Sequence, residues 1–410
     1  MTNGPERFTG SFTQQEPIPE EGIAAAVEVM RSGRLHRYNT APGEVGEVAL
    51  LEQEFAAMTG AKYCLAVASG GAAMTTALRA AGVRPGDPVL TNAFTLAPVP
   101  GAIAAVGAVP LYVEVTEGLV IDLGDLETRL GQASVLLLSH MRGHICDMDR
   151  LMALCTRAGV LVIEDCAHTM GANWNGVPSG RHGVMGCFST QTYKHINSGE
   201  GGFLISDDDE MMARAIIGSG SYMLYGRHLA APPAAVFEDL RFEVPNVSSR
   251  MDNLRAALLR PQLRKIETQA KRWNARHAVV EEGLRATPGL SLVERPAQEG
   301  YVASSFQFLL TGWAEEDVRS VLSRCAARGV ELKWFGNADP VAFTSRYDSW
   351  RYAPVPELPR TDRVLAGLLD LRLPLTFSLE DCAMIARIIR QEVSIVWQAR
   401  AGSSRPGAMG

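Results

Sequence analysis

The sequence VLLLSHMRGHICDMDRLMALCTRAGVLVIED, residues 135–165, contains two apolar runs on either side of a helix-compatible segment. Strands that are buried on both faces have such continuous apolar runs, and a helix between two of them implies a right-handed parallel crossover. The same alternation extends over residues 60–206, where the other apolar runs are CLAVAS, PVLTNAF, VPLYVEV, GCFST and GGFLIS. We therefore predict an α/β domain with a mostly parallel central sheet.

The length of the chain, 410 residues, predicts two domains because single hydrophobic cores stop growing near roughly 250 to 300 residues. Residues 1–255 are expected to form the larger domain, including the N-terminal segment. A helical stretch predicted over residues 250–286 would leave that domain, so that this interdomain helix and a smaller α+β domain occupy residues 256–400. Residues 401–410, AGSSRPGAMG, are expected to be a disordered tail.

The composition is that of a globular protein, with 47% hydrophobic and 20% charged residues and a formal net charge of −6. Lysine and arginine form no cluster, so neither a nucleic acid nor a membrane is expected as a partner. No apolar run is long enough for a membrane span and no signal peptide is visible, which favours a cytoplasmic protein. The seven cysteines lack CxxC spacing and indicate neither a disulfide framework nor a zinc site.

Lysine is rare in this chain, with five lysines against thirty-four arginines. Lys194 stands in CFSTQTYKHINSGEGG, residues 187–202, between a predicted strand and a glycine turn. An ε-amine can lose its proton and attack a carbonyl, whereas a guanidinium stays protonated. Lys194 is therefore a candidate nucleophile. Four others are interpreted as ordinary solvated or packing lysines: Lys62, Lys265, Lys271 and Lys333.

A glycine pair precedes a predicted helix in ASGGAAM, residues 68–74. The backbone amides of Gly70, Gly71 and Ala72 at such a helix N-terminus can hold a phosphate through hydrogen bonds and the helix dipole. A tight turn is the ordinary explanation of a glycine pair, so the neighbouring features must decide between the two.

Two further polar groups follow predicted strands. The run LVIED ends in Glu164 and Asp165, with His168 three residues further on, and a carboxylate there pairs with a protonated ring nitrogen or caps the next helix. Ser189 lies in GCFST, five residues before Lys194. Ligands of open α/β sheets gather at the carboxyl ends of the strands, so we expect these groups to meet. A phosphate cradle, a carboxylate and a lysine able to form a Schiff base are together what pyridoxal phosphate (PLP) requires of a protein.

Several motifs, in this order, resemble the DegT/DnrJ/StrS-type family of sugar aminotransferases. They are SGGAAMTTALRAAGVRPGDPVLTNAFT, SHMRGHICDMDRL, VIEDCAHTMGA, GCFSTQTYKHINSGEGGFLISDD, SSRMDNLRAALLRPQL and LRLPLTFSLEDCAMIARII. The resemblance covers about residues 15–395 and implies the PLP-dependent transferase fold type I, the fold of aspartate aminotransferase. It also implies a homodimer with active sites shared between the subunits.

The resemblance assigns roles by position in these motifs. Lys194 would bind PLP covalently, Asp165 would pair with the pyridine nitrogen, and His168 would lie beside the ring hydroxyl. The phosphate ligands would be Ser189 and the amides of Gly70 and Gly71, with Ala72 next to them.

Two positions depart from the family pattern. The family commonly places an aromatic residue on the pyridine ring where this chain has Leu96, so either Leu96 packs there or Phe94 substitutes. Ser248 stands where the family usually supplies an asparagine to the phosphate of the neighbouring subunit, and Asn246 lies two residues upstream. The cover of the ring and the contact between subunits therefore stay open.

The resemblance implies a ping-pong transamination, in which L-glutamine or L-glutamate gives its amino group to the cofactor and a ketone then receives it. The acceptor would be a nucleotide-linked keto sugar or a cyclitol ketone. KHINSGEGG and ELKWFG are similar to the branch that uses glutamine to aminate scyllo-inosose compounds. Tyr225, Arg227 and His228 would line the acceptor pocket or belong to a solvated loop.

Three other functions are alternatives. A related dehydratase subgroup carries histidine where Lys194 stands, which argues against it, and the adjacent His195 is interpreted as a packing group. A metal site in HMRGHICDMD, residues 140–149, is disfavoured because His140 ends a strand and would not share a helical face with His144. A non-catalytic PLP-binding regulator is disfavoured because no helix-turn-helix or basic patch accompanies the domain.

Overall fold

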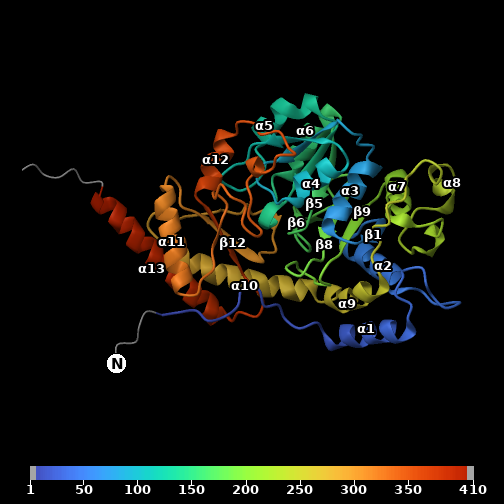
Figure 1. Ribbon diagram of the computed structural model, residues 1–410, viewed down its shortest axis with the longest axis horizontal. Helices are drawn as coiled ribbons and strands as arrows, with labels where there is room; N and C mark the ends of the chain where they lie inside the picture. Colours follow the sequence, from blue (N-terminus) through green and yellow to red (C-terminus); the bar gives the residue numbers. More distant parts are fainter. Residues whose placement is uncertain (1–5, 404–410) are drawn as a thin grey trace, which may run out of the picture.

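Seven strands form the central sheet of the larger domain in the computed structural model, which describes residues 6–403 (Figure 1). In spatial order they are β1 (Tyr63–Val67), β9 (Gly202–Ser206), β8 (Met185–Ser189), β5 (Leu161–Asp165), β4 (Val135–Ser139), β2 (Pro88–Asn92) and β3 (Val109–Val113). All seven predicted apolar runs are strands of this sheet. Only β9 is antiparallel to its neighbours, so the predicted mostly parallel sheet is confirmed.

Helices cover both faces of the sheet, because adjacent residues of each strand point to opposite faces and both sets are apolar. On β1, Leu65 and Val67 pack into the core on one face, and Cys64 and Ala66 into the core on the other. The first face is covered by α3 (Gly70–Ala80), α4 (Pro98–Ala105), α7 (Asp209–Gly220) and α8 (Phe237–Leu240). The second is covered by α2 (Glu47–Thr59), α5 (Leu123–Arg129), α6 (Met148–Ala158) and α9 (Asn253–Leu263).

The carboxyl ends of several strands meet at one edge of this sheet. β1 is antiparallel to β9, which is antiparallel to β8, so β1 runs in the same direction as β8, β5, β4 and β2. The loop after β1 ends at Ser69, whose hydroxyl accepts a hydrogen bond from the amide of Ala72 at 3.0 Å and caps α3. The candidate site residues predicted at strand ends therefore face a common region.

The smaller domain is built on a four-stranded sheet. Its strands, in spatial order, are β10 (Ser291–Leu292), β12 (Ser305–Leu309), β14 (Leu368–Arg372) and β13 (Lys333–Trp334). Its helices are α11 (Glu315–Ala327), α12 (Pro359–Ala366) and α13 (Leu379–Ser403). The predicted strand SSFQFLL corresponds to β12 and the predicted helix AEEDVRSVLSRCAARG to α11, so this domain has the expected α+β composition.

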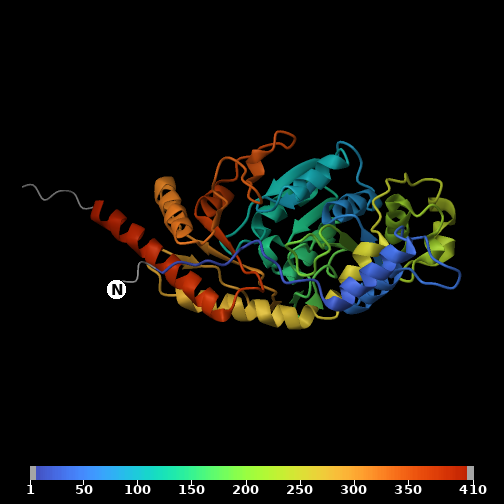
Figure 2. The same ribbon diagram turned by 60° about the horizontal axis from the view of Figure 1, so that its bottom comes forward.

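The N-terminal segment contacts both domains. Phe8 and Phe12 pack edge-on against Phe377 in the core of the small domain. The chain then reaches α1 (Glu20–Ser32), which packs against α9 of the large domain. Figure 2 shows this segment passing beside the long helix between the two domains.

The helical stretch predicted over residues 250–286 is two helices, α9 and α10 (Ile266–Leu284). Pro261 lies inside α9 and has no amide to donate, which weakens the helix shortly before it ends. α9 packs on α1 and α2, whereas α10 packs on α13 and β12 (Figure 1). We therefore propose that the domains divide between α9 and α10, after residue 263 rather than 255.

Two smaller features complete the fold. α13 ends at Ser403, within the expected tail, and residues 404–410 lie outside the described residues. A small sheet joins the domains, since β11 (Glu299–Gly300) pairs with β6 (Asn173–Trp174), which pairs with β7 (Val177–Pro178). Within residues 6–403, no helix combines the length and apolar character needed to cross a bilayer.

Candidate active site

Asp165 ends β5 and its carboxylate is held in place from two sides. The hydroxyl of Ser139 donates to Oδ2 at 2.9 Å, and the amide of Ala167 donates to Oδ1 at 3.1 Å. The hydroxyl of Thr95 in turn donates to that of Ser139 at 2.8 Å. No helix follows β5 in residues 166–172, so the interpretation of Asp165 as a helix cap does not hold. The carboxylate is instead fixed at the carboxyl edge of the sheet.

Lys194 lies in the loop between β8 and β9, as predicted, and its Nζ is 3.0 Å from Nε2 of His168. Burial lowers the pKa of Lys194 to about 7; the carboxylate of Asp165 opposes this shift, while neighbouring positive charges reinforce it. Burial and the charge of Lys194 lower the pKa of His168 well below its usual range. At neutral pH a large fraction of Lys194 is therefore the free amine, beside a neutral imidazole.

The loop that carries Lys194 is closed by close backbone contacts. The amide of Thr190 donates to the carbonyl of Gly201 at 2.9 Å, and the amide of Lys194 donates to the carbonyl of Gln191 at 2.8 Å. Gly201 has a φ of 149°, and a Cβ there would lie 2.3 Å from Oγ1 of Thr190. Only glycine fits at this position, which explains the predicted glycine turn after the lysine.

Hydrogen-bond donors at the start of α3 and the end of β8 form a candidate anion site. A Cβ added to Gly70 would lie 2.9 Å from Cβ of Ser189, so the serine lies directly against the glycine. Because the amide of Ala72 already donates to Ser69, it is not available to a ligand, whereas no acceptor among the described residues bonds the amides of Gly70 and Gly71. Two amides, a hydroxyl and the positive end of an 11-residue helix remain for a phosphate.

These groups together fit pyridoxal phosphate. The anion site, the fixed carboxylate of Asp165 and the amine of Lys194 all lie at the edge where β1, β5 and β8 end. An aromatic cofactor with a phosphate, a basic ring nitrogen and an aldehyde needs these three partners.

The two positions that depart from the family pattern differ in exposure. Phe94 is buried and packs its ring edge-on against Phe335 at 5.0 Å, whereas Leu96 keeps part of its surface exposed. Ser248 and Asn246 lie on an exposed loop, where the amide of Ser248 donates to Oδ1 of Asn246 at 3.1 Å. In this chain neither side chain bonds the anion site.

The loop with Tyr225, Arg227 and His228 is packed in part against the large domain, although Arg227 is exposed. His228 is buried, with Nδ1 3.1 Å from Oε2 of Glu52 and Nε2 2.8 Å from the hydroxyl of Tyr38. The ring of Tyr225 stacks on Phe237 with centroids 4.1 Å apart. Arg227 donates to the carbonyl of Tyr38. All three hold this loop to the large domain.

The sequence pattern of the DegT/DnrJ/EryC1/StrS aminotransferase family matches residues 17–390. The chain belongs to this family. An L-glutamine:2-deoxy-scyllo-inosose aminotransferase from Streptomyces paromomycinus is 31% identical over 67% of this chain and 65% of its own length. A UDP-N-acetyl-3-dehydro-α-D-glucosamine 3-aminotransferase from Acidithiobacillus ferrooxidans is 31% identical over 66% of this chain and 70% of its own length.

A solved structure has the same fold as this DegT-family chain. The crystal structure of 3-amino-5-hydroxybenzoic acid (AHBA) synthase superposes with a TM-score of 0.80 and 25% identity, covering 94% of this chain and 99% of that one. The family is one of PLP-dependent aminotransferases, and the fold is type I, as the resemblance implied.

Sequence reasoning missed three cations beside Lys194 in this DegT-family protein. The positive charges of Arg142, Arg372 and Lys333 all lower the pKa of Lys194. Lys333, interpreted from the sequence as a solvated or packing lysine, has a largely enclosed side chain, and burial lowers its pKa to about 8. The rarity of lysine, which pointed to Lys194, was also the signal that could have found Lys333.

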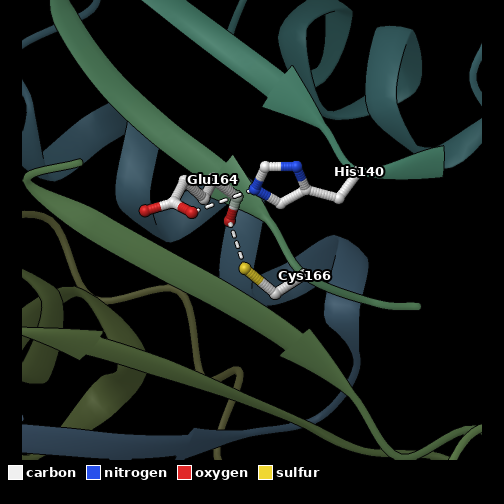
Figure 3. Close-up of side chains that lie close together, drawn as sticks. All are labelled: His140, Glu164 and Cys166. Carbon is white, nitrogen blue, oxygen red and sulfur yellow. Dashed lines mark hydrogen bonds and ion pairs between the residues drawn. The ribbon is translucent and has the colours of Figure 1, made fainter. Parts of the chain in front are cut away.

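A buried cluster of His140, Glu164 and Cys166 has donor atoms close enough together to suggest a metal site (Figure 3). Oε2 of Glu164 accepts from Nε2 of His140 and the amide of Gly180, both at 2.9 Å. Oε1 accepts from the amides of residues 182 and 183 at 2.8 Å. Four donors saturate the carboxylate, and burial raises the pKa of the Cys166 thiol, so this cluster serves as a structural hydrogen-bond network.

The candidate metal ligands in HMRGHICDMD make hydrogen bonds to different parts of the structure. Nε2 of His144 lies 2.9 Å from Oε1 of Gln307 in the small domain. Asp147 caps α6, and Asp149 accepts from Nε1 of Trp174 at 3.0 Å. The two histidines therefore lie in different surroundings, as their predicted positions on the chain suggested.

His195 packs inside the protein next to Lys194. Its imidazole is 6% exposed, lies edge-on to Trp273 at 5.2 Å, and has no hydrogen-bond partner for either nitrogen among residues 6–403. Burial, and then the charge of Lys194, lower its pKa to about 3. A histidine in the unfolded chain takes up a proton near pH 6.5, so below that pH proton uptake favours unfolding.

His195 is expected to make the stability of the fold sensitive to acid. Between about pH 7 and pH 5, His195 should cost the folded state about 2 kcal/mol, because only the unfolded chain is protonated there. Urea unfolding of wild type and His195→Gln at both pH values measures this contribution. The loss of stability on acidification should be smaller by that amount in the variant, and an identical loss in both proteins would contradict the assignment.

Proposed function

We propose that the protein uses PLP to transfer the amino group of L-glutamine or L-glutamate to a ketone on a sugar or cyclitol ring, by a ping-pong mechanism. The observation that carries the proposal is the amine of Lys194, poised near its neutral form 3.0 Å from His168 and at the same sheet edge as Asp165. When bound, PLP supplies an electron sink that stabilises negative charge on the α-carbon of the donor.

The chain's own residues would hold the cofactor and move the proton. The amides of Gly70 and Gly71 and the hydroxyl of Ser189 would bind the phosphate. Asp165, fixed by Ser139 and Ala167, would keep a ring nitrogen protonated, and His168 would contact the ring hydroxyl. The neutral amine of Lys194 would take the proton from the α-carbon of the donor and return it one carbon away.

We further propose how the two departures are accommodated. Leu96, which is only partly covered, would pack on the cofactor ring, because Phe94 is already buried against Phe335. Asn246 and Ser248, which are exposed and bond no group of the anion site in their own chain, would reach the phosphate of a second subunit. This arrangement supports a homodimer with shared active sites.

The acceptor stays within one chemical class. The scyllo-inosose aminotransferase and the UDP-sugar aminotransferase named above are equally similar to this chain, at 31% identity each. Both names describe the amination of a ring ketone, one on a cyclitol and one on a nucleotide-linked sugar. We therefore propose a ring ketone as the acceptor.

The test follows the two half-reactions separately. The protein loaded with PLP is mixed with L-glutamine or L-glutamate, and the loss of the visible absorption band is followed together with release of the keto acid. The aminated protein is then freed of donor and mixed with 2-deoxy-scyllo-inosose or a UDP-linked 3-keto sugar. Conversion of one donor and return of the band with one ring ketone are expected. No change with either donor would overturn the proposal.

A further inference from the structure

Three cations from both domains converge beside Lys194. Lys333 and Arg372 come from the small-domain sheet, where Lys333 is the cross-strand neighbour of Asp370, and Asp370 and Arg372 share a face of β14. Arg142 comes from the loop after β4 in the large domain and reaches Asp370, with Nη2 3.1 Å from Oδ2. The cluster therefore spans the contact between the domains.

These three cations share a single acid. Asp370 has no exposed surface, and its Oδ1 accepts a hydrogen bond from Nε2 of Gln307 at 2.7 Å. Its Oδ2 is the nearest carboxylate oxygen to Nζ of Lys333, at 4.0 Å. Arg372 has no ion pair within the described part of the chain. Its guanidinium lies 3.8 Å over the ring of Tyr193. Three positive charges thus face one buried negative charge, since Glu331, which also acts on Lys333, is exposed.

Two donors of the cluster have no hydrogen-bond acceptor in the described residues. Arg142 is 7% exposed, and its Nη2 is held only by the ion pair with Asp370, while its Nε and the Nζ of Lys333 make no hydrogen bond. Burying charged donors without partners costs several kcal/mol, and proteins normally satisfy them. The unpaired donors and the excess positive charge both indicate that an anion belongs here.

We propose that Arg142, Lys333 and Arg372 form a subsite for the α-carboxylate of the amino donor. This rests on the proposed function, and it adds a binding role for residues that the cofactor does not require. The subsite lies on the small-domain side of Lys194, whereas the anion site for the phosphate lies at Gly70 and Ser189.

The position of the subsite suits an amino acid. The amine that reacts and the carboxylate share one carbon in every α-amino acid, so a carboxylate site must lie next to the reacting lysine. Tyr193, the neighbour of Lys194 in sequence, is stacked under Arg372 and ties the two together. The positive charges of all three cations lower the pKa of the Lys194 amine. A cyclitol ketone has no negative charge to neutralise this cluster, whereas L-glutamine and L-glutamate both carry an α-carboxylate.

Asp370 would keep the cations in place when no donor is bound. Its fixed hydrogen bond to Gln307 leaves Oδ2 toward Arg142 and Lys333. The donor carboxylate would add a second negative charge and accept from the unpaired nitrogens. A planar guanidinium binds a carboxylate with two parallel hydrogen bonds, which gives orientation as well as affinity.

The test measures binding without cofactor chemistry. Isothermal titration calorimetry of the PLP-free protein compares 5-amino-5-oxopentanoate, which is glutamine without its α-amino group, with the neutral glutaramide of the same size. Wild type should bind the carboxylate at least about tenfold more tightly than the amide. Lys333→Gln and Arg372→Gln should each lose most of that preference and leave the binding of glutaramide unchanged. Lys271→Gln, an exposed lysine on α10, is the matched control and should behave as wild type.

A second measurement separates the donor from the acceptor. In the PLP-loaded protein, Lys333→Gln should raise the donor concentration for half-maximal conversion by about tenfold or more, whereas the concentration of 2-deoxy-scyllo-inosose for half-maximal reaction of the aminated protein should change by less than about twofold. Equal binding of the two ligands by wild type would overturn the subsite. A defect of Lys333→Gln that is confined to the reaction with a UDP-linked acceptor would also overturn the subsite, because it would assign the cations to the diphosphate of that acceptor.

One outcome separates the subsite from the proposed function. A wild type that binds the carboxylate preferentially but converts neither donor would contradict the proposed function and not the subsite. Thermal unfolding monitors the fold of each variant. Lys333 lies on β13 at the edge of its sheet, so its replacement disturbs fewer contacts than that of Arg372 and keeps the test open if the latter fails to fold.

Discussion

Lys194→Ala is expected to fold as wild type and to lower kcat by at least about 1,000-fold. The variant loses both the covalent attachment of PLP and the base that moves the α-proton. His168, 3.0 Å away in wild type, cannot replace it, because an imidazole cannot form the same bond with an aldehyde. Lys333 cannot replace it either, because it lies on β13 of the small domain and faces Asp370.

Absorption spectra and chemical trapping measure this loss. The visible band of PLP-loaded wild type should be absent or shifted in the variant, and borohydride should fix PLP to the peptide containing Lys194 only in wild type. Lys271→Ala, which removes an exposed lysine paired with Glu267, should match wild type in both assays. Wild-type turnover by Lys194→Ala would refute the assignment of the nucleophile.

Glu52→Ala is expected to lower the free energy of unfolding by about 3–5 kcal/mol. Glu52 on α2 is fully buried, pairs with Nη2 of Arg37 at 2.8 Å, and accepts the amide of Ala66 in β1 at 2.8 Å. Nδ1 of His228 lies 3.1 Å from it. Removing the carboxylate leaves the guanidinium charged and without its partner in the core.

The pH dependence of stability should identify the Glu52 carboxylate as the cause of this loss. Burial raises the pKa of Glu52, but the charges of Arg37 and His228 outweigh burial and lower it to about 2. The unfolded chain binds this proton near pH 4.3, so the contribution of Glu52 is present above that pH and lost as the pH falls toward about 2. The stability difference between wild type and Glu52→Ala, from urea unfolding, should therefore shrink between pH 7 and pH 3.

A surface carboxylate provides the comparison. Glu28 pairs with Arg31 while both side chains are largely exposed, so Glu28→Ala should unfold at the wild-type urea concentration. If Glu28→Ala and Glu52→Ala destabilised the protein equally, burial of the pair would not be the cause.

The large-domain sheet was predictable because each strand is a continuous apolar run with a signal of its own. The same pattern placed Asp165, Ser189 and Lys194 at strand ends, and parallel strands bring such ends to one edge. The order of the motifs then indicated the family. Local sequence and topology were sufficient here because the site uses residues at the ends of regular elements.

The remaining features depend on contacts between distant segments. Phe8 and Phe12 pack in the core of the small domain against residues that lie far away in the sequence, and no local pattern reveals these partners. His228 contacts a loop and a helix that lie nearly two hundred residues away in the sequence, so its burial could not be predicted from local sequence. Arg142 and Arg372 look like ordinary surface arginines until the two domains meet.

The pairing of β11 with β6 bears on how the protein moves. β11 lies in the chain between β10 and β12 of the small domain, yet its backbone bonds the large domain. The N-terminal segment and α10 add two more crossings between the domains. A hinge that rotated the small domain as a rigid lid would have to break main-chain hydrogen bonds at β11. We therefore expect substrates to enter and leave through motions of loops and side chains rather than through rotation of the whole small domain.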